Sequence, residues 1–180
     1  MGAALPVDQR HSGAESGRVV IFEASDLISH LALHVLTTNT VDQDQPPVMF
    51  AVHGTADRPS LGCKASMADC ALEELAAILP IAASDMRDHA GRCPAHPGPL
   101  TGFGLRLETR AICTGHDDRL GCPGMHDVGI VWVATRWRGF WWVELEHDTG
   151  KIFRRPFTPD NLTEIPREIA DTLTRCALQL

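Results

Sequence analysis

Long apolar runs are missing from this sequence, and lysine is scarce. No stretch approaches the roughly 20 apolar residues that a membrane-spanning helix needs, and the N-terminus lacks the basic start and apolar stretch of a secretory signal. The net charge is −7, and only Lys64 and Lys151 among the 16 basic residues are lysines. An acidic surface opposes general binding to a phosphate backbone, which needs clustered lysine and arginine. We therefore expect a soluble, cytoplasmic protein with no membrane partner, and the charge disfavours a nucleic-acid partner.

The common catalytic signatures are also absent. The sequence contains no Gly-x-Ser-x-Gly elbow, no Gly-rich phosphate loop ending in Lys-Ser or Lys-Thr, and no Gly-x-Gly-x-x-Gly after a strand. His30 and His34 share one face of an expected helix, a spacing that can bind zinc, but Leu31 stands where the metalloprotease motif His-Glu-x-x-His has its glutamate. We interpret this pair as the edge of an amphipathic stripe and assign no catalytic residue.

Six cysteines without a visible secretory signal argue against a disulfide framework. In a reducing compartment such a count indicates metal binding or buried thiols. Cys63 and Cys70 lack the Cys-x-x-Cys spacing of a redox pair, and Cys176 falls on the apolar stripe of an expected helix. We interpret these three as buried thiols.

The other three cysteines are each followed closely by a histidine, in three short Cys/His knuckles. Pairs two to four residues apart are typical of structural zinc sites, because a tight turn lets both side chains face one ion. The six candidate ligands are Cys93, His96, Cys113, His116, Cys122 and His126. The clustering of three such pairs predicts a bound metal, with a structural zinc as the cofactor.

One zinc needs four ligands, so six candidates leave the ligand set open. One set combines the first two knuckles. The other is the local set of the second and third knuckles, which we favour because closing a short loop costs less entropy. A mixed set drawn from all three knuckles is equally sound chemistry.

We expect a disordered leader over residues 1–17 and a single α+β domain over residues 18–180. Apolar spacing predicts a strand over 19–22, a helix from Ser25 to about Thr38, and strands over 48–52 and 104–113. We interpret 54–62 as a loop. A helix beginning at Ser66 should be interrupted by Pro80, and a last helix after Pro159 should bury Ile169, Leu173 and Cys176.

The segment from about 128 to 157 predicts a C-terminal antiparallel β-meander with helices packed on one face. A two-residue turn at Arg138-Gly139 and a three-residue turn ending at Gly150 would fix its register. That register places one set of apolar side chains toward the core and pairs Glu144 with Arg154. The expected core face holds Ile130, Trp132, Ala134, Trp141, Val143, Leu145, Phe153 and Phe157.

The opposite face of this meander would carry exposed aromatic and basic side chains. We predict a partner-binding surface of Trp137, Phe140, Trp142, Arg138 and Arg154, with another protein as the partner. Stacked nucleic-acid bases are the less favoured occupant.

The leading hypothesis from the sequence is a zinc-stabilised binding or regulatory protein without catalytic activity. A bacterial regulatory or accessory protein would fit the size and composition. One alternative is a small metal-dependent hydrolase that uses three knuckle ligands and leaves one position for water. The other is a small-molecule binding domain cupped by the sheet and the last helix.

Overall fold

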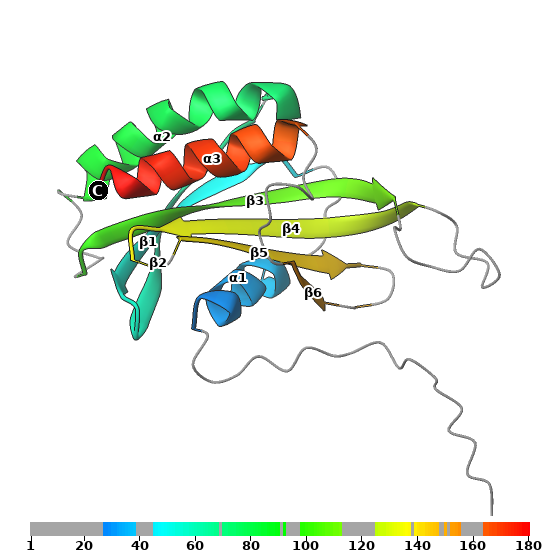
Figure 1. Cartoon of the computed structure of the whole chain (residues 1–180), viewed down its shortest axis with the longest axis horizontal. Helices are drawn as coiled ribbons and strands as arrows, with labels where there is room; N and C mark the ends of the chain where they lie inside the picture. The colour runs from blue at the N-terminus through cyan, green and yellow to red at the C-terminus, as the bar shows by residue number, and fades with distance from the viewer. Residues whose placement is uncertain are drawn as a thin grey trace, which may run out of the picture.

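The structure is a computed structural model that describes residues 27–38, 45–68, 70–90, 92, 98–112, 125–137, 139–147, 150, 152–155 and 164–180. Its elements are α1 (Leu27–Thr38), β1 (Val48–Thr55), β2 (Arg58–Ser66), the short 3-10 helix η1 (Leu72–Glu74), α2 (Leu75–Ala90), β3 (Leu100–Ile112), β4 (Met125–Thr135), β5 (Gly139–Glu146), β6 (Ile152–Arg155) and α3 (Glu164–Leu178). Figure 1 shows their arrangement. The expected leader over residues 1–17 and the expected strand over 19–22 lie outside the described residues.

All neighbouring strands pair antiparallel in one six-stranded sheet with the order β2-β1-β3-β4-β5-β6. The mixed α+β class predicted from the sequence is confirmed. The sheet as a whole is not a simple meander, because β1 lies between β2 and β3 and the chain passes through α2 before returning as β3. No helix in the described part of the chain is long and apolar enough to cross a membrane.

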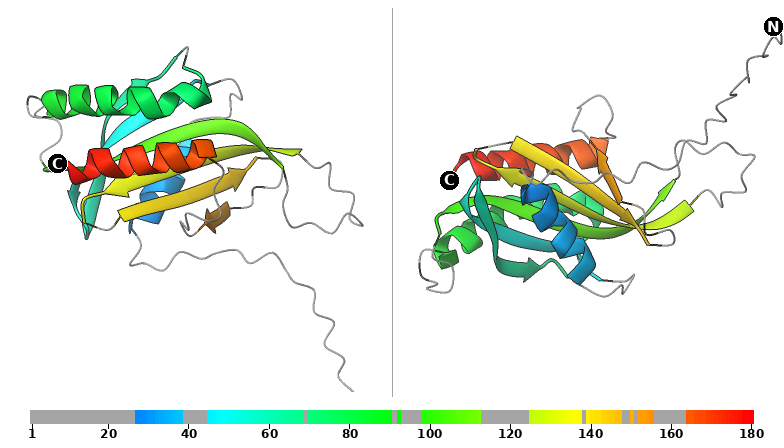
Figure 2. Two further views of the ribbon diagram at one scale, coloured as in Figure 1. Left: turned by 45° about the horizontal axis from the view of Figure 1, so that its top comes forward. Right: turned by 90° about the horizontal axis from the view of Figure 1, so that it is seen from below.

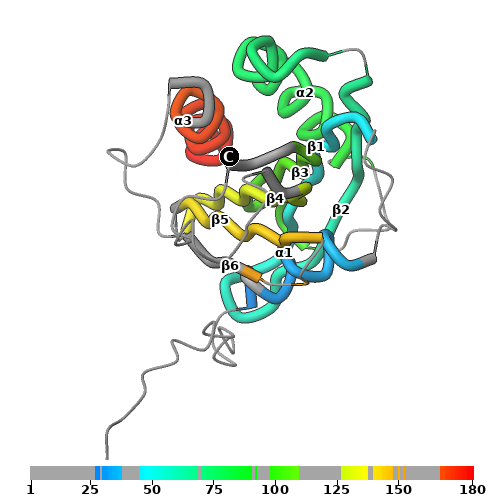
Figure 3. The backbone as a smooth tube through the Cα atoms, turned by 90° about the vertical axis from the view of Figure 1, so that its right-hand side faces the viewer, coloured from blue at the N-terminus to red at the C-terminus, as the bar shows by residue number. Residues whose placement is uncertain are grey.

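The helices cover both faces of the sheet, so the expectation that they pack on one face is wrong. α2 and α3 lie together on one face, and α1 lies alone on the other, as Figures 1 and 2 show. The view along the strands in Figure 3 shows the resulting three layers. Both faces of the central strands are therefore buried. Many antiparallel sheets instead bury one face and expose the other to solvent.

Most predicted elements are present, but β2 corrects the expected loop over 54–62. Its sequence carries Arg58, Pro59, Ser60 and Lys64, and most of its side chains are exposed or half-buried. Such a composition hides a strand from pattern analysis, because proline, serine and glycine are also typical of turns and loops.

The helix expected from Ser66 begins later, at Leu75, and Pro80 does not interrupt it. Glu74 forms the capping contact instead, since its Oε2 accepts a hydrogen bond from the backbone N–H of Ala71 at 3.2 Å. Pro80 lies on the exposed side of α2, where water can replace the donor that proline lacks.

The β4–β5 hairpin has a different register from the predicted one. Thr135 pairs with Gly139, so the loop has three residues rather than two, and Trp132 pairs with Trp142. A register shift by an odd number of residues moves every side chain of a strand to the other face. Trp142 therefore shares a face with Trp132, and Trp141 lies on the opposite face, which corrects the predicted core face.

The β5–β6 register is shifted in the same way. Val143 pairs with Arg154 and Glu144 with Phe153, so the predicted pairing of Glu144 with Arg154 is wrong. Gly150 has the positive φ of 65° expected of a turn glycine, and its N–H donates to the Glu146 carbonyl at 2.8 Å.

Each face of the sheet has its own apolar core. On the α2/α3 face, the rings of Trp132 and Trp142 meet edge to face with centroids 5.4 Å apart, and Ile169 and Leu173 of α3 are fully buried in the same cluster. On the α1 face, Phe50 packs over Gly104, whose missing side chain leaves room for the ring. The predicted burial of Ile169, Leu173 and Cys176 is confirmed.

Candidate functional site

An open, mostly apolar groove of about 540 Å³ lies between the edge strand β2 and α2. Its floor is formed by Met67 and Met86, which are nearly buried, and the apolar core of the α2/α3 face continues beneath it. The volume falls within the range of ligand-binding pockets. The full lining is Cys63, Lys64, Ala65, Ser66, Met67, Ala68, Cys70, Ile78, Ile81, Ala82, Asp85, Met86 and His89.

The groove exists because α2 has two apolar stripes. Leu75, Leu79 and Ala83 form the first stripe and are fully buried against the sheet and α3. Ile78 and Ala82 belong to a second stripe, which faces the groove and is only half-buried. An apolar pattern wider than one side of a helix is the sequence signal for a second covered face.

Ile81 forms an apolar rim at the edge of the groove. It is 64% exposed, one of three large apolar side chains that the described residues leave exposed. Lys64 and Asp85, also exposed, line the groove with charges of opposite sign. The groove therefore offers an apolar floor with polar, charged surroundings, which suits an amphipathic occupant.

Two thiols line the same groove. The sequence indicated that Cys63 and Cys70 are buried, but both are half-buried, and neither is in a disulfide. Burial raises the pKa of the Cys70 thiol, and the nearby Glu74 carboxylate raises it further. A thiol with a raised pKa is a weak nucleophile near neutral pH, so Cys70 is not an activated cysteine.

The exposed edge of β2 is protected against strand addition. Among the described residues β2 pairs only with β1, and its register shifts by one residue between the pairs Phe50–Lys64 and Val52–Leu61. Such a bulge twists an edge strand, and Pro59 and Lys64 are residues that oppose pairing with another strand. An occupant of the groove would therefore contact side chains rather than extend the sheet.

A second polar feature lies on the α1 face, where Glu108 bridges two basic side chains. Arg106 donates to its Oε1 at 2.5 Å, and the Nε2 of His147 lies 2.7 Å from its Oε2. All three side chains are less than 10% exposed, and Arg106 also donates to the Oε1 of Gln45 at 3.1 Å. Gly129 leaves room for the cluster, since a Cβ there would be 3.2 Å from the His147 ring. This closed ionic cluster ties β3 to the end of β5 and leaves no surface for a substrate.

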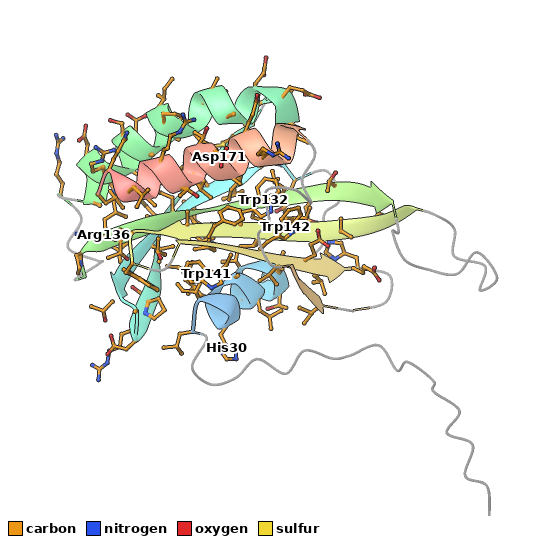
Figure 4. All side chains as sticks on the ribbon, in the orientation of Figure 1. His30, Trp132, Arg136, Trp141, Trp142 and Asp171 are labelled. Carbon is orange, nitrogen blue, oxygen red and sulfur yellow. The ribbon has the colours of Figure 1, made fainter. Side chains whose placement is uncertain are left out.

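The three aromatic residues of the predicted partner-binding surface, whose side chains the structure describes, do not lie on one exposed face. Trp142 is buried beneath α3, as Figure 4 shows, and Phe140 is half-buried against the same core. Trp137 packs on the other face, with its ring centroid 5.9 Å from that of Trp141. Arg138 lies outside the described residues, and Arg154 is placed in β6 without a described side chain.

Five of the six predicted zinc ligands, Cys93, His96, Cys113, His116 and Cys122, lie outside the described residues. His126 is the second residue of β4 and pairs with Ala111 of β3, with its side chain not described. Among the side chains that the structure does describe, no group of three or more His, Cys, Asp or Glu residues is placed to hold a metal ion.

No protein-family model, no curated protein and no solved structure matches this chain. Any functional assignment therefore rests on the residues of the chain itself. The groove was missed by sequence analysis because β2 was interpreted as a loop, and the ionic cluster was missed because its members are up to 41 residues apart in the sequence.

Proposed function

We propose that this protein is a cytoplasmic regulatory or accessory binding protein without catalytic activity, stabilised by zinc. Its binding site is the groove between β2 and α2, and the occupant is an amphipathic segment of another protein that inserts apolar side chains. The groove, with Ile81 at its rim, is the observation that carries this proposal.

The shape of the site supports a protein segment over a small molecule. A small-molecule pocket encloses most of its ligand, whereas this groove is open and its most apolar rim residue is 64% exposed. The space between the sheet and α3, where the sequence suggested a cupped ligand, is filled by Trp132, Trp142 and Leu173. An amphipathic helix laid in a groove covers both floor and rim, and its polar side can meet Lys64 and Asp85.

The test compares two exposed apolar residues on different helices. Peptides are selected by display against the full chain, and their affinities are measured for wild type, Ile81→Asp and Leu178→Asp. Leu178 is 66% exposed on α3 and does not line the groove, so it is a matched control. We expect Ile81→Asp to weaken binding about tenfold or more, as the loss of a central apolar contact does, and Leu178→Asp to leave it unchanged.

A bound peptide should also protect Cys63 and Cys70 from alkylation, because both line the groove. Peptides that bind Ile81→Asp as well as wild type, or that leave both thiols unprotected, would contradict the groove as the binding site. Selection of small apolar compounds but no peptide would show that the occupant is a small molecule instead.

For the zinc, we propose the local ligand set of the second and third knuckles. The β3–β4 ladder continues to the pair Ile112 and Met125, whose Cα atoms lie about 5 Å apart. Cys113 follows Ile112 directly, and His126 follows Met125 directly. This pairing supports a site in which one ion closes the 12-residue connection between the two strands.

The described residues that follow the first knuckle lie at the opposite end of β3 from the Ile112–Met125 pair. Gly98, two residues after His96, is held by the ring of His53, whose Nδ1 lies 3.0 Å from the Gly98 carbonyl oxygen. Leu100 then begins β3, and Ile112 ends it 12 residues later. A strand of that length spans about 40 Å, which supports a zinc site without Cys93 and His96.

A matched pair of cysteine variants tests this ligand set. We expect Cys113→Ser to bind one zinc ion less per chain and to melt at a lower temperature, and Cys93→Ser to keep the zinc content and melting temperature of wild type, as measured by metal analysis and thermal unfolding with and without chelator. Zinc loss in Cys93→Ser, or full zinc content in Cys113→Ser, would show that the local set is wrong.

A further inference from the structure

Two exposed histidines face outward from α1. His30 and His34 are four residues apart in a regular helix, so their Cβ atoms lie about 6 Å apart on one face. Both side chains are exposed, whereas Ile28, Ala32 and Val35 on the other side of α1 are buried against the sheet. Figure 4 shows His30 pointing away from the sheet. The outer face of α1 therefore presents two imidazoles one turn apart.

We propose that His30 and His34 bind a Zn²⁺ ion together with the same two histidines of a second copy of this chain. Two histidines at this helical spacing can bind one zinc ion, and imidazole suits zinc among the divalent metals. A closed zinc site takes four tetrahedral ligands. One α1 supplies two of them, and a two-fold axis through the ion supplies the other two, so the assembly closes at two copies.

The surface around the two histidines suits contact with a second copy. The described segment from Leu27 to Thr38 contains no aspartate, glutamate, lysine or arginine, so α1 itself brings no fixed charge to the contact between two chains of net charge −7. Leu27 and Leu33 are half-buried beside the histidines and would lose further water on contact. A helix of 12 residues offers only a small interface, so the two copies need the shared zinc ion to hold them together.

This site is independent of the proposed groove and of the knuckle zinc. The groove lies on the α2/α3 face of the sheet, and α1 covers the other face (Figure 1). Substitutions in α1 leave all six knuckle residues unchanged, so the difference between wild type and an α1 variant reports the α1 site alone.

The experiment measures mass and zinc stoichiometry on the full chain. We expect Zn²⁺ to shift the mass in solution from one 19.6 kDa chain to two, EDTA to reverse the shift, and Mg²⁺, which prefers oxygen ligands, to cause none. His30→Ala combined with His34→Ala should abolish the shift and bind half a zinc ion less per chain than wild type. Thr37→Ala, on the same outer stripe, is the matched control and should behave as wild type.

The two-copy site also predicts that a different zinc ligand at position 34 can restore pairing. His34→Cys replaces one zinc ligand by another and should restore zinc-dependent pairing, whereas His34→Ala should not. Doubling of mass in the double alanine variant would overturn the proposal. A difference of one whole zinc per chain without a mass change would also overturn it, because the pair would then bind metal within a single chain.

Discussion

The α2/α3 face of the sheet and its α1 face are both buried, but by very different lengths of helix. α2 and α3 contribute 16 and 15 residues, and α1 contributes 12. A helix of 12 residues is about 18 Å long, less than half the length of β3. One helix therefore cannot cover its face as two helices cover theirs.

The two faces are filled by different kinds of side chain. The α2/α3 face is a broad apolar cluster built around Trp132 and Trp142. On the α1 face, the apolar cluster ends near Leu36, and the Arg106–Glu108–His147 cluster begins there, with Gly129 between them. The comparison shows how a short helix can close a long sheet: beyond the described helix, hydrogen-bonded polar side chains pack against one another.

The largest effect is expected from breaking the ionic cluster on the α1 face. Glu108→Leu leaves the Arg106 guanidinium, which is 4% exposed, without its carboxylate, and should lower the free energy of unfolding by about 3–5 kcal/mol. Adding Arg106→Met should restore most of that loss, because an apolar pair can replace a buried ion pair at little cost. Urea unfolding measures both. Equal stability of wild type and Glu108→Leu would mean that the cluster does not close this face.

The sequence predicted much of the fold and little of this difference between the faces. Helical periodicity identified α1 and α3, and apolar runs identified β1 and β3 to β6, whereas β2 was interpreted as a loop. The tryptophans of β4 and β5 were assigned to the wrong faces for a local reason. The loop spans residues 136–138 instead of the predicted Arg138-Gly139, and this odd change of register reverses every side chain of β5; composition does not reveal the loop position.

The candidate sites were harder to predict because they are formed by distant segments. Glu108 and His147 meet only after β3, β4 and β5 have paired, and the groove depends on β2, whose Pro59 and Lys64 are typical of loops. His30 and His34 are the exception. Their spacing was visible in the sequence, and the structure adds that both are exposed.

A smaller loss of stability is expected from alanine substitution at two glycines on the α1 face, and its size should differ between them. A Cβ at Gly104 would lie 2.0 Å from Cζ of Phe50, inside the apolar part, whereas at Gly129 it would lie 3.0 Å from Cδ2 of Leu36. We expect Gly104→Ala to cost about 2–3 kcal/mol, because Phe50 must move in a packed core, and Gly129→Ala to cost about 1 kcal/mol. Urea unfolding of both variants gives the order. The reverse order would show that the ionic cluster, not the Phe50 packing, is the more rigid part of this face.

The smallest expected effect is a difference in thiol alkylation between the open groove and the closed part of the α2/α3 face. Cys176 on α3 is 4% exposed, and Cys70 lines the groove, so alkylation followed by peptide mass spectrometry should label Cys70 in the folded protein and Cys176 only in urea. Burial raises the pKa of both thiols, which lowers the fraction of reactive thiolate at a given pH.

The Glu74 carboxylate is the second cause of the raised pKa of Cys70, and it acts only at the groove. Glu74→Gln removes the negative charge but keeps an oxygen that can accept from the Ala71 N–H. The pKa of Cys70 should therefore fall, and its labelling at pH 8 should become faster while that of Cys176 stays unchanged. Equal labelling of both thiols in the folded wild type would mean that α3 leaves its side of the sheet as open as the groove, and that the face covered by two helices is not closed.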